Sequence, residues 1–399
     1  MKFEDMNIEK SVLGSLNSMG FENPTRIQSE TIPIIKQGHD VIGQSETGSG
    51  KTAAFGIPLV EKVVKGKNIQ ALVLAPTREL SIQIAGELVK FSRGKGLFIQ
   101  TVYGGVSIGP QIRGLERAEI VVGTPGRILD HMRRGTLDAS NLKIFVLDEA
   151  DKMIDMGFIE DIELIGQNIP DDRQTLLFSA TMPNSLIGMR DRFTKNAKKI
   201  KTETKVREDV LSQYYCDVDY KMKFSLIVHL INQENPKLAI IFCNSRRDAN
   251  SVARNLRYNG INAAELHGGL SQQKREDVIE SFHKGTTKIL VATDVAARGL
   301  DIKNVTHIFN YSIPKSAEDY TNRIGRTARA GESGKVVSLL SRDDHDSFRK
   351  IIGIFSYRIE KMQVHDFKIL QFRKYQQDET RNFEGRRHFG RRSWSYRRR

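Results

Sequence analysis

The chain has 399 residues but only two cysteines, Cys216 and Cys243, too few for a disulfide framework or a four-cysteine metal site. It lacks any run of the roughly eighteen apolar residues that a membrane span requires. Its first ten residues have no apolar core, so no signal peptide is expected. These absences favour a protein of the reducing cytoplasm over a secreted or membrane protein.

Acidic residues are outnumbered, since 62 Lys and Arg face 48 Asp and Glu, which leaves a formal net charge of +14. This excess indicates a polyanionic partner, with nucleic acid as the first choice and a membrane surface as the second. The hydrophobic share of 39% is that of a globular protein, and the length allows two domains, each with its own core.

Residues 143–151 combine a short apolar run with a cluster of carboxylates. The run Ile144–Leu147 is typical of a strand buried on both faces of a parallel sheet, and Asp148, Glu149 and Asp151 follow it. Ligands of such sheets bind beyond the carboxyl ends of the strands. Acids there suit a magnesium-bound triphosphate, with one holding the metal and another activating water. An acidic turn before a helix is the alternative.

A phosphate-loop pattern lies about a hundred residues upstream, between a strand expected at 40–43 and a helix expected at 53–65. Ser45 replaces the usual first glycine of the pattern. Gly48 and Gly50 would let backbone N–H groups surround phosphates, while Lys51 reaches the terminal phosphates and Thr52 binds magnesium. This placement favours a nucleotide-hydrolysing core over a chance Gly-Lys-Thr.

Before this loop, Pro24 and Thr25 predict the start of an amphipathic helix that continues to about Lys36. The amide of Gln28 offers a donor and an acceptor, which could match the N6 and N7 edge of adenine. The alternatives are a solvated helix residue for Gln28 and a core residue for Phe21.

Strand-like and helical segments alternate along the chain, which predicts doubly wound parallel sheets. In residues 1–203 the expected strands are 40–43, 70–75, 98–103, 119–123, 143–147 and 175–178. Each polar cluster that follows such a strand is an ordinary loop by itself, but together they form a rim of small residues, hydroxyls and arginines that suits a sugar-phosphate backbone. Glycine at positions 105 and 126 would let that backbone approach closely.

Residues 201–209 are charged and aperiodic and are expected to link this domain to a second one at 211–365. The strands expected there are 211–218, 238–243, 261–266, 288–292, 305–311 and 335–340. The second domain has no phosphate loop. If residues 316–328 are helical, Asn322, Arg326 and Arg329 share one face. They are either solvated or arginine fingers that reach the nucleotide when the domains close.

The C-terminal tail at 373–399 is expected to be disordered, and its last nineteen residues, 381–399, hold eight arginines and one acid, Glu384. Phe383, Phe389, Trp394 and Tyr396 are interleaved with the arginines. Arginine with aromatic residues suits single-stranded nucleic acid through charge and stacking. A solubilising or nuclear-import tail is the alternative.

Taken together, these motifs resemble those of the DEAD-box ATP-dependent RNA helicases, superfamily 2 helicases, of bacterial type. The resemblance runs from about Phe3 to Ile352 and includes Asp148-Glu149-Ala150-Asp151 itself. It implies ATP and Mg²⁺ as cofactors, two tandem RecA-like domains, and RNA as the partner, with ribosomal or RNA-decay proteins as further candidates. The implied activity is RNA-dependent ATP hydrolysis that separates short duplexes or remodels RNA–protein complexes.

The resemblance also assigns roles to residues. Catalysis would use Lys51, Asp148, Glu149, Arg326 and Arg329. Nucleotide would contact Phe21, Gln28, Ser45, Glu46, Thr47, Gly48, Ser49, Gly50, Lys51, Thr52 and Asp301, with magnesium at Thr52 and, through water, at Asp148. Coupling would involve Asp151, Ser179, Thr181 and Asn322. RNA would contact Pro76, Thr77, Arg78, Gly104, Gly105, Thr124, Pro125, Gly126, Arg127, Asn244, Arg246, His267, Gly268, Thr293, Asp294 and Arg298.

Two positions depart from the family pattern. Asn322 stands where a histidine is usual, which bears on coupling between the domains. Ala328 stands where glycine is common, and if the helix includes it, alanine is the better helix former. Two other functions share these motifs, namely an ATP-gated RNA clamp that does not separate strands and a DNA-directed motor. The glutamine motif and the acidic tetrad argue against the motor.

Overall fold

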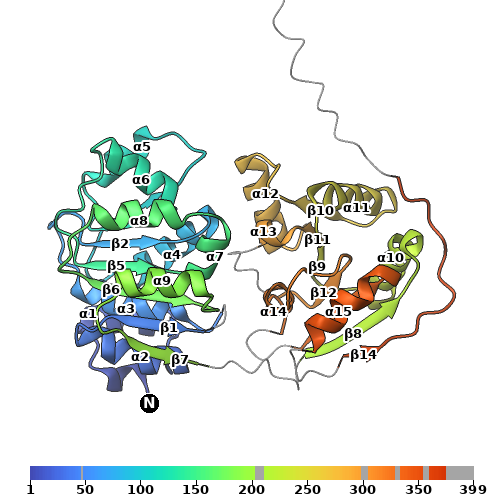
Figure 1. The fold of residues 1–399 in the computed structure, drawn as a ribbon, viewed down its shortest axis with the longest axis horizontal. Coiled ribbons are helices and arrows are strands. Elements are labelled where there is room, and N and C mark those ends of the chain that lie inside the picture. Colours follow the sequence, from blue (N-terminus) through green and yellow to red (C-terminus); the bar gives the residue numbers. More distant parts are fainter. Residues whose placement is uncertain (46–47, 203–210, 298–303, 329–332, 354–358, 374–399) are drawn as a thin grey trace, which may run out of the picture.

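A twisted parallel sheet organises each half of the chain (Figure 1). The computed structural model describes residues 1–45, 48–202, 211–297, 304–328, 333–353 and 359–373. The first sheet has seven strands in the order β3-β4-β2-β5-β6-β1-β7. Its strands are β1 (Val41–Gln44), β2 (Ala71–Leu74), β3 (Ile99–Val102), β4 (Ile120–Gly123), β5 (Ile144–Leu147), β6 (Gln174–Ser179) and β7 (Lys198–Lys201).

The second sheet also has seven strands, in the order β10-β11-β9-β12-β13-β8-β14. They are β8 (Leu211–Asp217), β9 (Ala239–Phe242), β10 (Ala263–Leu266), β11 (Ile289–Ala292), β12 (His307–Asn310), β13 (Gly334–Leu340) and β14 (Glu360–Lys361). Counted from the first strand of each sheet, the two orders are identical. The predicted fold of two tandem doubly wound parallel sheets is therefore confirmed.

Helices cover both faces of the first sheet. One face packs against η1 (Phe3–Met6), α1 (Lys10–Ser18), α2 (Arg26–Lys36), α3 (Lys51–Lys62) and α4 (Arg78–Phe91). The other face packs against α5 (Gly109–Leu115), α6 (Pro125–Arg133), α7 (Ala150–Asp155), α8 (Ile159–Gln167) and α9 (Asn184–Phe193). Strands β2, β4 and β5, in the interior of the sheet, are continuous apolar runs because both of their faces are buried.

The second sheet is covered in the same way. One face packs against α12 (Gln272–His283), α13 (Asp294–Ala297), α14 (Ala317–Ile324) and α15 (His345–Ile352). The other packs against α10 (Lys223–Glu234) and α11 (Arg246–Tyr258), and the short helices η2 (Tyr220–Met222) and η3 (Arg342–Asp344) complete this half. Side chains up to Phe372 pack against the α10–α11 side, which is past the boundary at residue 365 that the sequence suggested.

Every strand expected from the sequence is present to within one or two residues at each end, but two edge strands were missed. Strand β7 reads Lys-Lys-Ile-Lys, which has no apolar run, and β14 has two residues. Edge strands face solvent along one side, so hydrophobic patterning does not mark them. Within the described residues, no helix is both long enough and apolar enough to cross a bilayer.

The helix predicted at 316–328 is shorter than expected. Helix α14 ends at Ile324, Gly325 caps it, and Arg326 lies in the turn that follows. Ala328 has φ +54°, in the left-handed region. The interpretation of Ala328 as a favourable helix residue is therefore wrong, because glycine is the residue that adopts this conformation without strain. Most of the expected linker and the basic tail beyond 373 lie outside the described residues.

Candidate nucleotide and RNA sites

The phosphate loop joins β1 to the N-terminus of α3. Gly48 and Gly50 have φ values of +89° and +93°, which explains glycine at both positions. Lys51 opens the helix with 7% of its surface exposed, and its Nζ donates to the carbonyl oxygen of Ser45 at 2.7 Å. Thr52 and Ser49 lie partly exposed beside it, whereas Glu46 and Thr47 lie outside the described residues. A helix N-terminus with a buried ammonium is suited to binding phosphate.

Gln28 connects the upstream motif to this loop. Its Oε1 accepts the backbone N–H of Thr25 at 2.9 Å, and its Nε2 donates to the carbonyl oxygen of Gly50 at 3.1 Å. Each end of the amide therefore makes one of the two hydrogen bonds that it can form, and one donor and one acceptor site remain for adenine. Phe21 lies partly buried against Phe3 and Phe91, at ring-centroid distances of 5.9 and 6.0 Å.

The acidic tetrad is buried beyond the end of β5. Asp148 is 2% exposed and Glu149 is 4% exposed. Burial raises the pKa of Asp148 to about 7, although Lys51 opposes the shift. Burial would also raise the pKa of Glu149, but the ammonium groups of Lys152 and Lys51 lower it below its usual value. Two adjacent carboxylates therefore differ in their tendency to ionise, as paired acids with separate roles do.

Lys152 was not predicted as part of the site. It is 1% exposed, and its Nζ lies 2.9 Å from Oε1 of Glu149. Glu149 itself has φ +51°, a strained conformation for a residue with a Cβ, and it caps α7. The identity of residue 152 alone gives no signal, because a lysine in the first turn after an acidic cluster is usually solvent-exposed.

The structure brings together three of the four predicted coupling residues. Oδ2 of Asp151 accepts the N–H groups of Ala180 and Thr181, at 3.1 and 2.8 Å, and the Thr181 hydroxyl at 3.0 Å. The Ser179 hydroxyl accepts the N–H of Asp151 at 3.3 Å and donates to the Thr181 carbonyl at 2.7 Å. The acidic tetrad is therefore bonded directly to the loop after β6.

The fourth residue, Asn322, lies elsewhere. It lines a cavity of about 10 Å³ together with Arg326, Asp319 and Asp294, which has room for about one water molecule. Its Nδ2 is buried without a hydrogen-bond partner among the described residues. Arg326 is buried, and its charge lowers the pKa of Glu149 in the first domain. Arg329, Arg298 and Asp301 lie outside the described residues.

A groove of about 680 Å³ separates the two halves of the molecule at the edge where the predicted RNA residues lie. Half of the sixteen residues predicted to contact RNA line it, namely Pro76, Thr77, Arg78, Gly104, Thr124, Gly126, Arg127 and Gly268. Gly105 has φ +82°, and the Arg78 guanidinium occupies the space that a side chain there would need. Apolar groups that were not predicted, Met156, Phe158, Leu270 and Val295, also line the groove.

Two contacts across the groove join the domains. Arg78 donates from Nη1 to Oε1 of Gln272 at 3.1 Å, and Arg275 pairs with Glu79 at 2.8 Å. Gln272 and Arg275 lie in the first turns of α12, and Arg275 also donates to the carbonyl oxygen of Ala296 at 2.9 Å. Sequence patterns could not indicate these residues, because each pairing joins positions far apart in the chain.

The remaining RNA candidates among the described residues do not line the groove. The side chains of Asn244 and Asp294 bind the buried guanidinium of Arg323, with Asp294 holding it at two oxygens, 2.6 and 2.8 Å away. His267 is buried and accepts the N–H of Gly269 at 3.1 Å through Nδ1. Thr293 is buried, Pro125 opens α6, and Arg246 opens α11 beside Gly268.

This combination defines a class of protein. Two doubly wound domains, one with a phosphate loop and buried acids and the other with an arginine near those acids, are typical of motors that hydrolyse nucleoside triphosphates. The family model described as DEAD/DEAH box helicase matches residues 25–187, and that of the helicase conserved C-terminal domain matches residues 222–331. The chain belongs to the DEAD-box ATP-dependent RNA helicase family.

Curated relatives match most of the chain. The DEAD-box ATP-dependent RNA helicase CshA of Geobacillus kaustophilus strain HTA426 is 46% identical over 364 residues, which cover 90% of this chain and 78% of the relative. CshA of Bacillus subtilis strain 168 is 44% identical over 364 residues, covering 90% and 74%.

Solved structures are similar over both domains. Dbp5 of S. cerevisiae bound to RNA and ADP BeF3 has a TM-score of 0.83 at 30% identity, covering 90% of this chain and 95% of that one. A DEAD box protein from Methanococcus jannaschii is 41% identical but has a TM-score of 0.54, with 91% and 99% covered. Identity and structural similarity rank these two proteins in opposite orders.

Proposed function

We propose that this protein couples ATP hydrolysis to the local separation of short RNA duplexes or the remodelling of RNA–protein complexes. The proposal rests on how the candidate catalytic and RNA-binding residues are distributed between the two domains at the cleft. The phosphate loop and acids lie in the first domain, Arg326 of the second domain is near enough for its charge to lower the pKa of Glu149, and both domains line the RNA groove. Closure of the domains would then complete the catalytic site and the RNA groove in one step.

Magnesium fits the oxygen donors present. Asp148 is a buried carboxylate whose charged form is disfavoured by burial, so a cation beside it would stabilise that form. Thr52 offers a hydroxyl one residue after the phosphate-binding lysine. These residues would hold the ion together with phosphate oxygens, as hard oxygen ligands suit Mg²⁺. Bound magnesium would neutralise charge that develops on the phosphates.

The side chains then have separable tasks. Lys51 would leave the Ser45 carbonyl and bind the terminal phosphates, and Gln28 would bind adenine with its remaining donor and acceptor sites. Glu149, whose low pKa keeps it ionised, would orient or deprotonate the attacking water. Arg326, with Arg329 and the ribose-contacting Asp301 assigned by the family pattern, would complete the site from the second domain.

RNA would bind along the groove by its backbone, because the predicted contact residues that line it are mainly arginines, hydroxyls and glycines. Little sequence preference follows, and specificity would come from protein partners such as ribosomal or RNA-decay proteins. A cytoplasmic location is consistent with Cys216 and Cys243, which are both buried free thiols.

A strand-displacement assay on a short RNA duplex tests this function against the rival clamp. With ATP the parent protein should release the shorter strand. Glu149→Gln should bind ATP and RNA yet release far less strand per minute, because hydrolysis is blocked. ATP-dependent RNA retention by the parent without any strand release would favour the clamp and contradict the proposal.

A further inference from the structure

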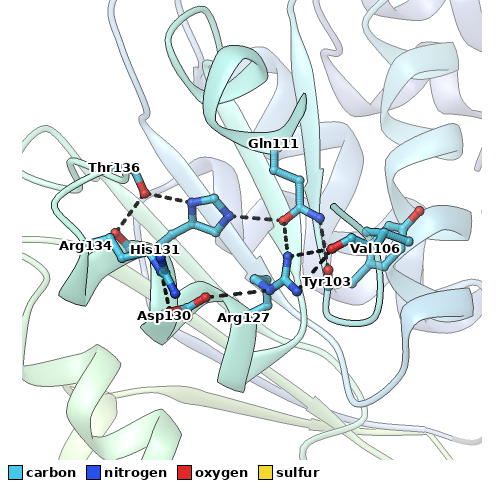
Figure 2. Close-up of polar contacts among 8 residues, drawn as sticks. All are labelled: Tyr103, Val106, Gln111, Arg127, Asp130, His131, Arg134 and Thr136. Atoms are coloured by element: carbon cyan, nitrogen blue, oxygen red, sulfur yellow. Dashed lines mark hydrogen bonds and ion pairs between the residues drawn. The ribbon is translucent and has the colours of Figure 1, made fainter. Parts of the chain in front are cut away.

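A polar cluster that includes the groove residue Arg127 connects the loop after β3 to helices α5 and α6 (Figure 2). Gln111, on α5, and His131, on α6, are 5% and 0% exposed, and the family assignment gives neither a role. Nε2 of Gln111 donates to the carbonyl oxygen of Tyr103 at 3.0 Å. Its Oε1 lies 3.1 Å from Nε2 of His131 and 3.5 Å from Nη1 of Arg127. One amide on α5 therefore contacts three residues on two other segments, the loop after β3 and helix α6.

Arg127, like the neighbouring Asp130, lines the groove. Its two terminal nitrogens donate to the carbonyl oxygen of Val106 at 3.3 and 3.4 Å, and its Nε lies 3.9 Å from Oδ2 of Asp130. Its side chain is only 16% exposed. Three neighbours, Gln111, Val106 and Asp130, thus hold the guanidinium, and the loop that contains Gly104 and Gly105 is held to α6 through it.

The chemistry of the partners determines the protonation of the cluster. A carbonyl can only accept and a guanidinium can only donate, so the Gln111 amide cannot be flipped. Its Oε1 must therefore accept from His131, which places the imidazole proton on Nε2. Nδ1 is left as an acceptor, and the Thr136 hydroxyl lies 2.8 Å from it. Burial and Arg127 lower the pKa of His131, so the ring stays neutral near pH 7.

We propose that Gln111 and His131 are positioning residues that hold Arg127 and the 103–106 loop at a fixed spacing for the RNA backbone. Because flexible arginine side chains lose rotamer freedom when they bind, a guanidinium oriented in advance binds a phosphate more tightly. His131 fixes Gln111, and Gln111 fixes both the loop and Arg127. Neither residue contacts nucleotide, so their effect should be confined to RNA affinity. The inference rests on the proposed RNA contact of Arg127.

The test measures the RNA concentration that gives half-maximal stimulation of ATP hydrolysis. Gln111→Met keeps the side-chain volume but removes the hydrogen bonds. It should raise that concentration about tenfold, while turnover at saturating RNA and the KM for ATP stay unchanged. Gln100→Met is the matched control, because it makes the same change on β3 at a side chain that bonds only to the Thr101 carbonyl among the described residues. It should leave all three quantities unchanged.

Arg127→Ala separates the two hypotheses. Loss of RNA affinity in this variant supports the RNA contact, and no loss contradicts that part of the proposed function. Where Arg127→Ala weakens RNA binding, adding Gln111→Met should weaken it by clearly less than tenfold further, since the part of the amide's effect that acts through the guanidinium is already lost. Three results would overturn the positioning role. They are a full tenfold further loss of RNA affinity in the double variant, an unchanged RNA affinity in Gln111→Met alone, and a lower ATP turnover of Gln111→Met at saturating RNA.

A measurement on the parent protein covers the case in which Gln111→Met does not fold. Nitrogen-15 NMR of the histidine rings reports which nitrogen carries the proton, and His131→Gln identifies the signal by its loss. A neutral ring with the proton on Nε2 at pH 7 is expected. A proton on Nδ1, or a charged ring, would contradict the hydrogen-bond order from which the inference is drawn.

Discussion

The two halves of the molecule share one strand order and differ in which loops carry chemistry. Strands β3 and β10 hold equivalent places, and each is followed by a Gly-Gly pair, Gly104-Gly105 and Gly268-Gly269. Strands β2 and β9 are equivalent too, and each leads to a helix whose first turn is capped by a hydroxyl, from Thr77 or Ser245. At this edge of the sheet, the two domains thus share a Gly-Gly pair and a helix capped by a hydroxyl.

The segments that would bind nucleotide differ between the two domains. Strand β1 leads into the phosphate loop and Lys51, whereas its equivalent β8 leads to η2 and then to Lys223 at the start of α10. Lys223 is tied to Asp344 at 2.7 Å and to the Tyr311 carbonyl. Strand β5 ends in buried acids, and β12 ends in Tyr311 and Ser312. The difference suggests that the second domain supplies RNA contacts and Arg326, while the first alone binds the phosphates.

The largest expected effect contrasts these two lysines. Lys51→Ala should lower ATP turnover by at least about a hundredfold, because a preorganised charge at the phosphates is lost. Lys223→Ala breaks a buried ion pair and should instead cost about 3 kcal/mol of stability. ATP turnover measured at low temperature reports the loss of activity, and unfolding in urea reports the loss of stability. If a folded Lys223→Ala protein lost as much ATP turnover as Lys51→Ala, the assignment of phosphate binding to the first domain alone would be contradicted.

The basic tail follows the second domain, so its removal tests how much this half of the chain contributes to RNA binding. Deleting residues 381–399 removes eight arginines and one glutamate. RNA affinity should fall, and the slope of log affinity against log salt should flatten by roughly 0.7 per lost phosphate contact. ATP turnover at saturating RNA should survive. Binding titrations at several salt concentrations check this, and an unchanged slope would remove the tail from RNA binding.

Asn322 tests how the halves communicate. Its buried Nδ2 has no partner among the described residues, so it is available to the first domain on closure. Asn322→Ala should reduce strand separation about tenfold while ATP binding changes less. Asn322→His should remain active and acquire a pH dependence near neutrality that asparagine cannot show. Parent-like unwinding by Asn322→Ala would exclude this residue from coupling.

The smallest expected effect is at Ala328, where φ is +54°. Ala328→Gly relieves left-handed strain but loses a partly buried methyl, so the gain should be about 0.5–1 kcal/mol. Asn304→Gly, at φ +63°, is the control with little expected change, because asparagine tolerates this region. Urea unfolding measures both. A destabilised Ala328→Gly protein would show that the methyl contact outweighs the strain.

Local patterns were sufficient for much of the fold and for the family. The phosphate loop, the acidic tetrad and the strands are each encoded within a few consecutive residues. Contacts between distant segments were not predictable from them. Arg275 beside Glu79 and Gln111 between His131 and Arg127 depend on how helices pack. Lys152 lies only three residues after Glu149, and there it was the burial that the sequence did not show. Helical spacing also failed at Arg326, because Gly325 ends α14 before it.

The most direct test of the division between the halves is steady-state ATP hydrolysis with and without RNA. Because Arg326 and the RNA groove belong to the closed pair of domains, RNA should raise turnover at least about tenfold. DNA of the same sequence should do so far less, since it lacks the 2′-hydroxyl that backbone recognition uses. Equal turnover without RNA, or equal stimulation by DNA, would contradict the account.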